Sequence, residues 1–429
     1  MNPVEIVTFG CRLNAFESEA IGRAAAAAGL VDAVIVNTCA VTAEAERQAR
    51  QALRRARREH PGRKIIATGC AATLAPEKYA GLADVVLDNE AKLRVASYYP
   101  HPPTAAPRVP PFPASGRGVE FPPRSLAGEG ARRAGEGVER SETKPLRARA
   151  YLQVQQGCDH RCTFCIIPYA RGPSRSVPIG AIVAEARRMV EAGCREIVLT
   201  GVDMTAYGAD LPGRPSLGQM ARRLLAAVPE LPRLRLSSLD PSELDDDLWR
   251  LFAREERLMP HLHLSLQAGD DLILKRMKRR HSRADAIAVA RRARELRPET
   301  AIGADLIAGF PTETDDMFRR SLDIVEECGI AFLHVFPYSP RPGTPAARMP
   351  AVAPELVRER AARLRAAGTA RLAQELGARI GQSNDVLIEK PGVGRAAFYA
   401  PVALDGAPGT VRRVRFVGAA EGKLIGAAT

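Results

Sequence analysis

The sequence predicts an α/β protein with three structured parts: an N-terminal open parallel sheet, a central partial (β/α)6 barrel and a small C-terminal all-β barrel. Two patterns in the 429 residues carry this prediction. Strand-like apolar runs alternate with helical patterns over residues 1–99, and again from residue 149 to about 350, as in parallel sheets. Beyond residue 377, short β-type runs are separated by Gly and Pro, which is typical of a small barrel.

Composition and charge limit the class of protein. The formal net charge of +13 favours a polyanionic partner such as a nucleic acid. The first residues lack the pattern of a secretion signal and no apolar run reaches membrane length, so we expect a cytoplasmic protein that contacts no membrane. Eight cysteines in such a protein favour reduced thiols and metal ligation over a disulfide framework.

Residues 1–99 form the first predicted domain. Its expected strands and helices are the runs at residues 4–9, 15–28, 33–37, 43–60, 65–67 and 84–87. Cys11, Cys39 and Cys70 each follow one of the first three strands, and ligands gather beyond the carboxyl ends of parallel strands. A buried small residue is the simplest role for any one of these cysteines. Three in equivalent positions favour a three-thiolate metal cluster.

Residues 100–148 differ in composition from the rest of the chain, being rich in Pro, Gly, Ala and Arg. The sequence Ala-Gly-Glu-Gly occurs at residues 127–130 and again at residues 134–137. The segment contains too little apolar surface to pack. We predict a disordered linker or insertion without chemistry of its own.

Three further cysteines, Cys158, Cys162 and Cys165, lie within eight residues. A structural zinc site needs four protein ligands, and His160 is the candidate for the fourth. A 4Fe-4S cluster held by three cysteines instead leaves one iron open to a substrate or cofactor. The Cys-x3-Cys-x2-Cys spacing resembles the signature of radical S-adenosylmethionine (SAM) enzymes. That resemblance implies that SAM binds the open iron and is cleaved to a 5′-deoxyadenosyl radical by an electron from the cluster.

The triad follows the first of six strands predicted for the central domain, residues 149–377. The expected strands are residues 149–156, 196–200, 233–239, 261–267, 302–308 and 332–337. Helical patterns lie between them, for example at residues 178–192, 242–254 and 313–328, and a basic helix at residues 353–375 ends the domain. Six such units predict a partial (β/α)6 barrel, whose chemistry is expected at the carboxyl ends of the strands.

Polar residues at those strand ends, or just beyond the triad, are candidates for binding the cofactor. They are Gly201, Asp203, Ser238, Gln267, Asp305 and Arg175. Arg175 and its neighbour Arg171 are suited to balance a carboxylate or phosphate. A structural cap or a solvated turn is the alternative role for each. Cys194 and Cys328 stand singly in or beside helices and are predicted to be packing thiols.

The last predicted domain spans residues 378–429. Its β-type runs are residues 385–389, 397–401, 410–416 and 424–426. Arg412, Arg413 and Arg415 lie on one of these runs and put positive charge on both faces of the strand, which favours contacts with RNA phosphates. A solvated edge strand is the alternative.

Across nearly the whole chain apart from residues 100–148, the sequence resembles the methylthiotransferase family of radical-SAM enzymes. The matching stretches are residues 8–14, 37–42, 157–171, 263–269 and 309–314. The resemblance implies an N-terminal cluster domain, a radical-SAM barrel and a C-terminal TRAM domain that binds RNA, with two 4Fe-4S clusters and SAM as cofactors. Two features depart from the family pattern: Gln156 replaces the usual acidic residue, and the segment at residues 100–148 is longer than expected.

Within that family, residues 237–241 and 334–344 are most similar to the branch that methylthiolates carbon 2 of N6-threonylcarbamoyladenosine beside the tRNA anticodon. Arg341 would then meet the threonyl carboxylate, or else shape a Pro-Gly turn. The implied partners are the anticodon loop of tRNA and an electron donor such as flavodoxin or ferredoxin, and we expect a monomer. Two alternatives stay open: the branch acting on isopentenyladenosine, and a non-catalytic, metal-containing RNA-binding protein.

Overall fold

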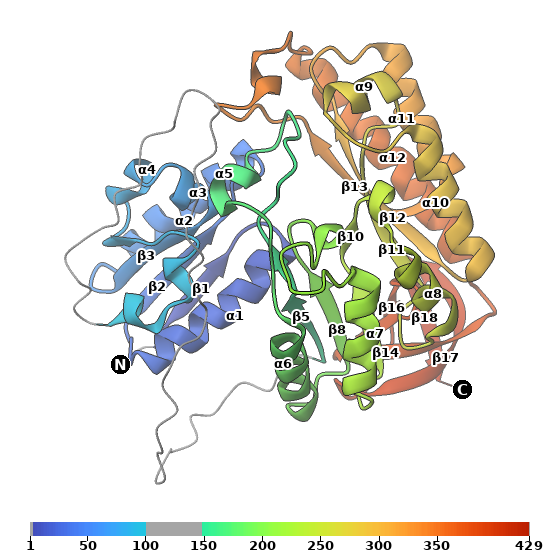
Figure 1. Cartoon of the computed structure of the whole chain (residues 1–429), viewed down its shortest axis with the longest axis horizontal. Helices are drawn as coiled ribbons and strands as arrows, with labels where there is room; N and C mark the ends of the chain where they lie inside the picture. Colours follow the sequence, from blue (N-terminus) through green and yellow to red (C-terminus); the bar gives the residue numbers. More distant parts are fainter. Residues whose placement is uncertain (1–2, 100–147, 429) are drawn as a thin grey trace.

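The computed structural model describes residues 3–99 and 148–428, which form three structural parts (Figure 1). An N-terminal sheet domain lies beside a central β/α barrel, and a closed β-barrel is formed by the last strands of the chain. This arrangement confirms the predicted fold class. The predicted linker lies outside the described residues except for Ala148. Among the described residues, no helix combines the length and apolar character needed to cross a membrane.

The N-terminal domain is a parallel sheet with the strand order β1-β2-β3-β4. Its elements are β1 (Glu5–Thr8), α1 (Arg12–Ala27), β2 (Ala33–Thr38), α2 (Ala43–Glu59), β3 (Lys64–Gly69), α3 (Cys70–Leu74), α4 (Glu77–Ala80) and β4 (Val85–Val86), then 3-10 helices at Ala91–Leu93 and Val95–Tyr98. Strand β2 is buried along its whole length, as expected for an apolar strand with a neighbour on each side. Helix α2 is capped by Thr42, has an acidic first turn and a basic last turn, and so suits the helix dipole.

The central barrel contains two parallel sheets, β5-β8-β9 and β10-β11-β12-β13. The strands are β5 (Arg149–Gln153), β8 (Glu196–Thr200), β9 (Arg233–Leu236), β10 (Ser238–Leu239), β11 (His261–Gln267), β12 (Ala301–Ala308) and β13 (Ile330–Pro337). The predicted strand at residues 233–239 is therefore two strands. The cause is that the Ser237 amide still donates to the Leu199 carbonyl of the first sheet, whereas Ser238 already pairs with β11.

The predicted strand at residues 149–156 is also divided, because β6 (Gln155–Gln156) leaves the barrel sheet to pair antiparallel with β7 (Arg175–Ser176). Helices cover the outside of the barrel (Figure 1). They are α6 (Ile179–Glu191), α7 (Leu217–Ala227), α8 (Asp246–Arg254), α9 (Asp271–Arg276), α10 (Arg283–Leu296), α11 (Asp315–Glu327) and α12 (Pro354–Ala378), with α5 (Ile167–Arg171) beside the N-terminal domain and 3-10 turns at Met204–Ala206, Pro241–Glu243 and Pro345–Arg348. Cys194 and Cys328 are buried in the main apolar core, as predicted for packing thiols.

The C-terminal strands close into a barrel in the order β14-β15-β16-β18-β17. They are β14 (Ser383–Lys390), β15 (Val393–Ala396), β16 (Pro401–Ala403), β17 (Val411–Ala420) and β18 (Lys423–Ala428). The strand predicted at residues 397–401 is wrong, because this stretch is mostly the turn between β15 and β16, where the Ala396 amide donates to the Ala400 carbonyl. The turn places Tyr399 against the central barrel, with its ring stacked on His261 at a centroid distance of 4.4 Å.

Candidate active site

The first set of cysteines lies on the loop at residues 158–165, which follows β6. Gly157 begins this loop with a φ of +73°, and a Cβ there would lie 1.9 Å from the Pro173 carbonyl oxygen, so the position requires glycine. In the middle of the loop, the Thr163 amide donates to the Met277 carbonyl at 3.1 Å. The backbone is therefore held just before the first thiol and again between the second and the third.

The thiols of Cys158, Cys162 and Cys165 are free and partly accessible. Burial and then the Asp203 carboxylate raise the pKa of Cys158 to about 12, and burial raises the pKa of Cys165 to about 12. Cys162 and Cys165 contribute to the raised pKa of Cys158, and Cys162 contributes to that of Cys165, because these sulfur atoms are neighbours. A bound metal displaces such protons and makes the thiolates ligands. The donor set fits a 4Fe-4S cluster held by three cysteines.

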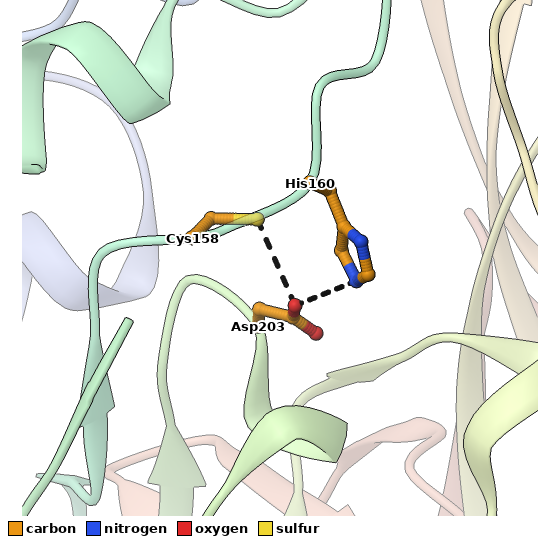
Figure 2. Close-up of side chains that lie close together, drawn as sticks. All are labelled: Cys158, His160 and Asp203. Carbon is orange, nitrogen blue, oxygen red and sulfur yellow. Dashed lines mark hydrogen bonds and ion pairs between the residues drawn. The ribbon is translucent and has the colours of Figure 1, made fainter. Parts of the chain in front are cut away.

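His160, the candidate for a fourth zinc ligand, lies with Cys158 beside the Asp203 carboxylate. Figure 2 shows the Asp203 carboxylate facing both Cys158 and His160. The Cys158 thiol donates to Asp203 Oδ2 at 3.6 Å, and His160 Nε2 lies 2.8 Å from the same oxygen. Hydrogen bonds with Asp203 and Glu243 raise the pKa of His160 to about 10. The imidazole is therefore engaged by carboxylates.

Two of the six predicted cofactor-binding residues, Gly201 and Asp203, follow β8 beside this loop. The Gln155 side chain fixes their backbone, since its Oε1 accepts hydrogen bonds from the Val202 and Asp203 amides at 3.0 and 2.8 Å. A Cβ at Gly201 would lie 3.0 Å from Gln155, which is closer than an ordinary contact. Strands β6 and β8 together hold the Asp203 carboxylate next to Cys158.

The other four predicted cofactor-binding residues have different surroundings. Gln267 and Asp305 line one cavity at the ends of β11 and β12. Ser238 is half-buried in β10, and Arg175 is exposed on β7, where it donates to the Arg171 carbonyl at 3.4 Å. Of the six, Asp203 alone contacts a cysteine of this set in the described part of the chain.

The second set of cysteines forms where three parallel strands end. Cys11 precedes α1, Cys39 follows β2 and Cys70 begins α3. A Cβ at Gly10, which has a φ of +97°, would lie 2.7 Å from the Cys39 sulfur, so the Cys11 loop closely approaches Cys39. Burial raises the pKa of Cys39 to about 12, with smaller contributions from Cys11 and Cys70. Cys39 and Cys70 are buried whereas Cys11 is exposed, so the set is accessible from one side.

Buried charged groups surround Cys70. Arg171 Nε donates to the Cys70 sulfur at 3.2 Å, and Arg171 Nη1 donates to Glu17 Oε1 at 2.7 Å. Lys92 Nζ donates to Glu17 Oε2 at 2.7 Å, and the pKa of Lys92 is lowered by burial although Glu17 opposes this shift. Two cations and one carboxylate leave one positive charge unbalanced. A negatively charged occupant on the cysteines would balance it.

A cavity of about 210 Å³ is bordered by both cysteine loops. Its lining residues are Val41, Thr42, Phe164, Gln267, Asp305, Ile307, Phe336, Pro337, Tyr338 and Ser339. Val41 and Thr42 come just after Cys39, and Phe164 belongs to the loop at residues 158–165. Cys70 also contributes to the raised pKa of Cys165, because the two cysteine sets are close.

The arginine predicted to meet the substrate carboxylate has a different partner. Arg341 is buried, and its Nη2 lies 2.7 Å from Glu46 Oε2 of α2. Its carbonyl accepts hydrogen bonds from the amide and hydroxyl of Thr344, at 3.1 and 2.7 Å. This geometry favours the turn-shaping role over contact with a substrate.

The three arginines predicted to bind RNA lie on β17. Arg412, Arg413 and Arg415 are all exposed. Arg413 pairs with Asp385 of the neighbouring strand at 3.3 Å. Their exposure leaves the strand able to meet a phosphate backbone.

Sequence reasoning missed two histidines that contact Asp305. His263 Nε2 lies 2.9 Å and His334 Nδ1 lies 3.1 Å from Asp305 Oδ1. The signal in the sequence is the run His-Leu-His-Leu, whose period of two places His261 and His263 on one face of β11. No local signal indicates that His334 of β13 joins them.

Comparisons with known proteins agree with this geometry. Residues 152–325 match the radical SAM superfamily, and residues 3–87 match an uncharacterized protein family, UPF0004. The solved structure of TsrM, a radical S-adenosylmethionine methyltransferase from Kitasatospora setae, aligns with a TM-score of 0.53 over 81% of this chain and 74% of that chain, at 17% identity, and so supports the fold alone. The chain is a radical SAM protein.

Two relatives define the family more closely. The threonylcarbamoyladenosine tRNA methylthiotransferase MtaB of Rickettsia prowazekii is 47% identical over 97% of this chain and 96% of its own length. The protein of the same name from Thermotoga maritima is 36% identical over 83% of this chain and 79% of its own length. The chain belongs to the MtaB family of radical SAM methylthiotransferases. Membership confirms SAM and the 4Fe-4S cluster as the predicted classes of cofactor.

Proposed function

We propose that this chain transfers a methylthio group to carbon 2 of N6-threonylcarbamoyladenosine beside the anticodon of tRNA, and that it uses two 4Fe-4S clusters and SAM. The observation that carries the proposal is the single cavity bordered by both cysteine loops. It lies in a chain that aligns over 97% of its length with a relative named for this reaction. Carbon 2 carries an unactivated aryl hydrogen, which acid–base catalysis does not remove, so a cofactor has to supply the chemistry.

The barrel cysteines, Cys158, Cys162 and Cys165, would hold the radical-generating cluster. SAM bound beside it would supply the carbon radical that the reaction needs. The Asp203 carboxylate lies beside Cys158 and is therefore well placed to orient SAM. It carries a negative charge, because the hydrogen bond from His160 keeps the pKa of Asp203 below its usual range although burial opposes this. Metal-bound sulfur carries no proton, so Cys158 would stop donating to Asp203 and leave that carboxylate to accept a hydrogen bond from the amino group of SAM.

The N-terminal cysteines, Cys11, Cys39 and Cys70, would hold a second cluster. The unbalanced positive charge of Arg171 and Lys92 beside Cys70 supports an anionic occupant at this set. Arg171 belongs to helix α5, directly after the barrel loop, yet it donates to Cys70 of the other domain. The two sets are therefore held in a fixed relation by a buried contact.

The cavity suits a base turned out of its RNA stack. Phe164, Ile307 and Phe336 give it apolar walls, and Gln267 and Asp305 give it polar groups. This combination is what recognition of a single flipped nucleotide requires. The exposed arginines of β17 are not among the residues that line the cavity, and they are suited to hold the RNA backbone.

The remaining proposed partners follow from the chemistry. Cleavage of SAM consumes an electron, and a flavodoxin or ferredoxin is the class of donor proposed to deliver it. A monomer in the cytoplasm, where tRNA is modified, completes the proposal.

Nucleoside mass spectrometry of tRNA from a strain lacking this gene tests the proposal. The methylthio derivative of threonylcarbamoyladenosine should disappear, methylthio-isopentenyladenosine should persist, and the intact gene should restore the lost nucleoside. Loss of methylthio-isopentenyladenosine alone would establish the isopentenyladenosine branch instead. If purified protein reduced with dithionite binds tRNA but never cleaves SAM, the chain is a non-catalytic RNA-binding protein.

A further inference from the structure

The cavity contains a carboxylate that two histidines hold in place from one side. Both His263 Nε2 and His334 Nδ1 are within hydrogen-bond distance of the same oxygen, Oδ1 of Asp305, at 2.9 and 3.1 Å. Burial opposes ionisation of Asp305, but the two histidines keep its pKa well below the usual range. Asp305 is therefore a carboxylate anion with a fixed orientation.

The second carboxylate oxygen of Asp305 has no donor among the described residues. Both histidines use Oδ1, and Asp305 itself lines the cavity. The Asp305 side chain is 17% exposed, whereas that of His263 is 1% exposed. His263 therefore lies behind the carboxylate, on the side away from the opening. The arrangement presents one anionic hydrogen-bond acceptor to whatever enters the cavity.

We propose that Asp305 is a specificity-determining residue, whose Oδ2 accepts a hydrogen bond from an N–H or O–H group in the N6 side chain of the substrate. This inference rests on the proposed function and names the group by which that site would recognise its nucleoside. A threonylcarbamoyl side chain carries amide N–H groups and a hydroxyl, all of which are donors. An isopentenyl side chain carries no donor beyond the N6–H itself, so a buried acceptor facing it stays unsatisfied.

The charge of Asp305 also excludes one orientation of the substrate. The threonyl group ends in a carboxylate, and two carboxylates in contact repel each other strongly in a site that excludes water. The substrate carboxylate must therefore point away from Asp305, and the donors of the side chain point toward it. Tyr338, which also lines the cavity, has a buried hydroxyl without a hydrogen-bond partner among the described residues and can serve the carbonyl of the same side chain.

A metal ion is the competing occupant, because His263, Asp305 and His334 offer three ligand atoms within 4.8 Å of one another. A histidine bound to metal through Nε2 carries its proton on Nδ1, and such a proton normally has an acceptor. Nδ1 of His263 is buried without any hydrogen-bond partner in the described structure. An unpaired buried N–H is rarer than an unpaired acceptor. The surroundings of His263 therefore favour a histidine that donates from Nε2 to Asp305.

Binding measurements on anaerobically reconstituted protein test the proposal. Anticodon stem-loops carrying threonylcarbamoyladenosine, isopentenyladenosine or unmodified adenosine are titrated into wild type, Asp305→Asn and the control Asp316→Asn, whose carboxylate is exposed on α11. We expect wild type to prefer the threonylcarbamoyl stem-loop, and Asp305→Asn to bind that stem-loop about ten- to hundredfold more weakly with little change for the others. The iron content and the Kd for SAM should be unchanged, and Asp316→Asn should behave as wild type.

A second variant covers the case in which Asp305→Asn does not fold. His334 is 47% exposed, so His334→Ala is expected to fold, to free Asp305 from one of its two donors and to lower the same preference severalfold. Unchanged preference in both variants overturns the proposal. A raised Kd for SAM in Asp305→Asn reassigns the carboxylate to the cofactor, and a zinc or extra iron equivalent that is lost in Asp305→Asn reassigns it to a metal; either result overturns the proposal.

Failure of the underlying function has a different signature. If the deletion strain keeps the methylthio derivative of threonylcarbamoyladenosine, the proposed function is wrong and the assignment of Asp305 is wrong with it. If that derivative disappears but wild type binds all three stem-loops equally, the function stands and only the role of Asp305 is wrong.

Discussion

The two cysteine sets offer the same three thiols in different electrostatic surroundings. The barrel set lies on one continuous loop beside both charges, with Asp203 Oδ2 3.6 Å from the Cys158 sulfur and Arg279 Nη1 donating to the Cys162 sulfur at 3.8 Å. The N-terminal set comes from three strand ends and faces cations, with Arg171 Nε 3.2 Å from the Cys70 sulfur. Nearby cations favour an anionic cluster and its reduced state, whereas carboxylates favour binding of the positively charged groups of SAM. The comparison indicates one site that binds a cationic cofactor and one that retains an anionic centre.

Removal of one ligand from each set should separate the two roles, and this is the largest effect we expect. Wild type should hold about eight irons per chain, and Cys158→Ala and Cys39→Ala should each lose about half of them. Cys158→Ala should also abolish cleavage of SAM, whereas Cys39→Ala should still release 5′-deoxyadenosine when reduced with dithionite. Iron analysis and chromatography of the nucleoside products measure both outcomes.

Cys328→Ala is the matched control for these variants, because Cys328 is a buried core thiol in neither set. It should keep all the iron and the full rate of SAM cleavage. Loss of SAM cleavage in Cys39→Ala as well would mean that the two sets do not have separate roles. Stoichiometric zinc with no iron in wild type would contradict both cluster assignments.

The two sets also differ in how far the sequence predicts them. The spacing of three cysteines within eight residues is visible directly in the sequence. Cys11, Cys39 and Cys70, in contrast, are about thirty residues apart and converge only because parallel strands end at one edge of a sheet. The charged groups around the cysteines are even harder to predict from the sequence. Arg171 stands out in the sequence as a basic residue after the triad, but its partners Glu17 and Cys70 belong to another domain and depend on tertiary packing.

The fold, too, is predicted well where the signal is local and poorly where it depends on tertiary packing. The alternation of strand-like and helical segments predicts the two α/β domains well, because the spacing of apolar residues indicates which side chains of a helix or strand are buried. The failures lie where one strand changes partners, at Ser237, and where a turn has strand-like residues, at Tyr399. Tyr399 lies in a stretch with strand propensity, yet it has a positive φ of 84° and its ring stacks on His261 of the central barrel. Such positions depend on a neighbouring domain, which a local pattern does not contain.

Arg171→Met tests the cationic side of the comparison with the next largest effect. It leaves Glu17 buried with Lys92 as its remaining cation and removes the donor to Cys70. Loss of the charged hydrogen bonding between Arg171 and Glu17 costs about 1.5–3 kcal/mol, which chemical denaturation of the metal-free protein measures. The variant should also retain less iron than wild type, and the missing iron should be that of the N-terminal set.

Arg250→Met is the control for this variant, because Arg250 forms an exposed ion pair with Asp247 on the outer helix α8. Removing such a pair should leave stability and iron content unchanged within error. Equal iron retention in Arg171→Met and Arg250→Met would remove the argument that the buried positive charge holds an anionic cluster.

Asp203→Asn tests the carboxylate side with a smaller effect. The amide keeps the size of the side chain but loses the charged oxygen that would accept a hydrogen bond from the amino group of SAM. A hydrogen bond to a charged group contributes about 1.5–3 kcal/mol, so the Kd for SAM should rise about ten- to hundredfold while both sets keep their iron. Equilibrium dialysis under anaerobic conditions measures this, with the exposed Asp246→Asn as control. Loss of iron without a change in the Kd for SAM would instead make Asp203 a residue that stabilises the cluster loop.

The smallest expected effect is on RNA binding. It tests whether RNA binding depends on residues outside both cysteine sets. Arg412 and Arg415 are exposed on β17 of the C-terminal barrel, so the double variant Arg412→Ala, Arg415→Ala should fold normally. Each lost phosphate contact lowers the slope of log affinity against log salt by about one unit, so tRNA binding should weaken modestly at low salt and depend less on salt concentration. Iron content and the rate of SAM cleavage should match wild type, and Arg254→Ala, an exposed arginine on α8, should change none of these quantities. An unchanged salt slope in the double variant would move the RNA-binding surface away from β17, and the basic face of α2, which begins just after Cys39, is the next surface to test.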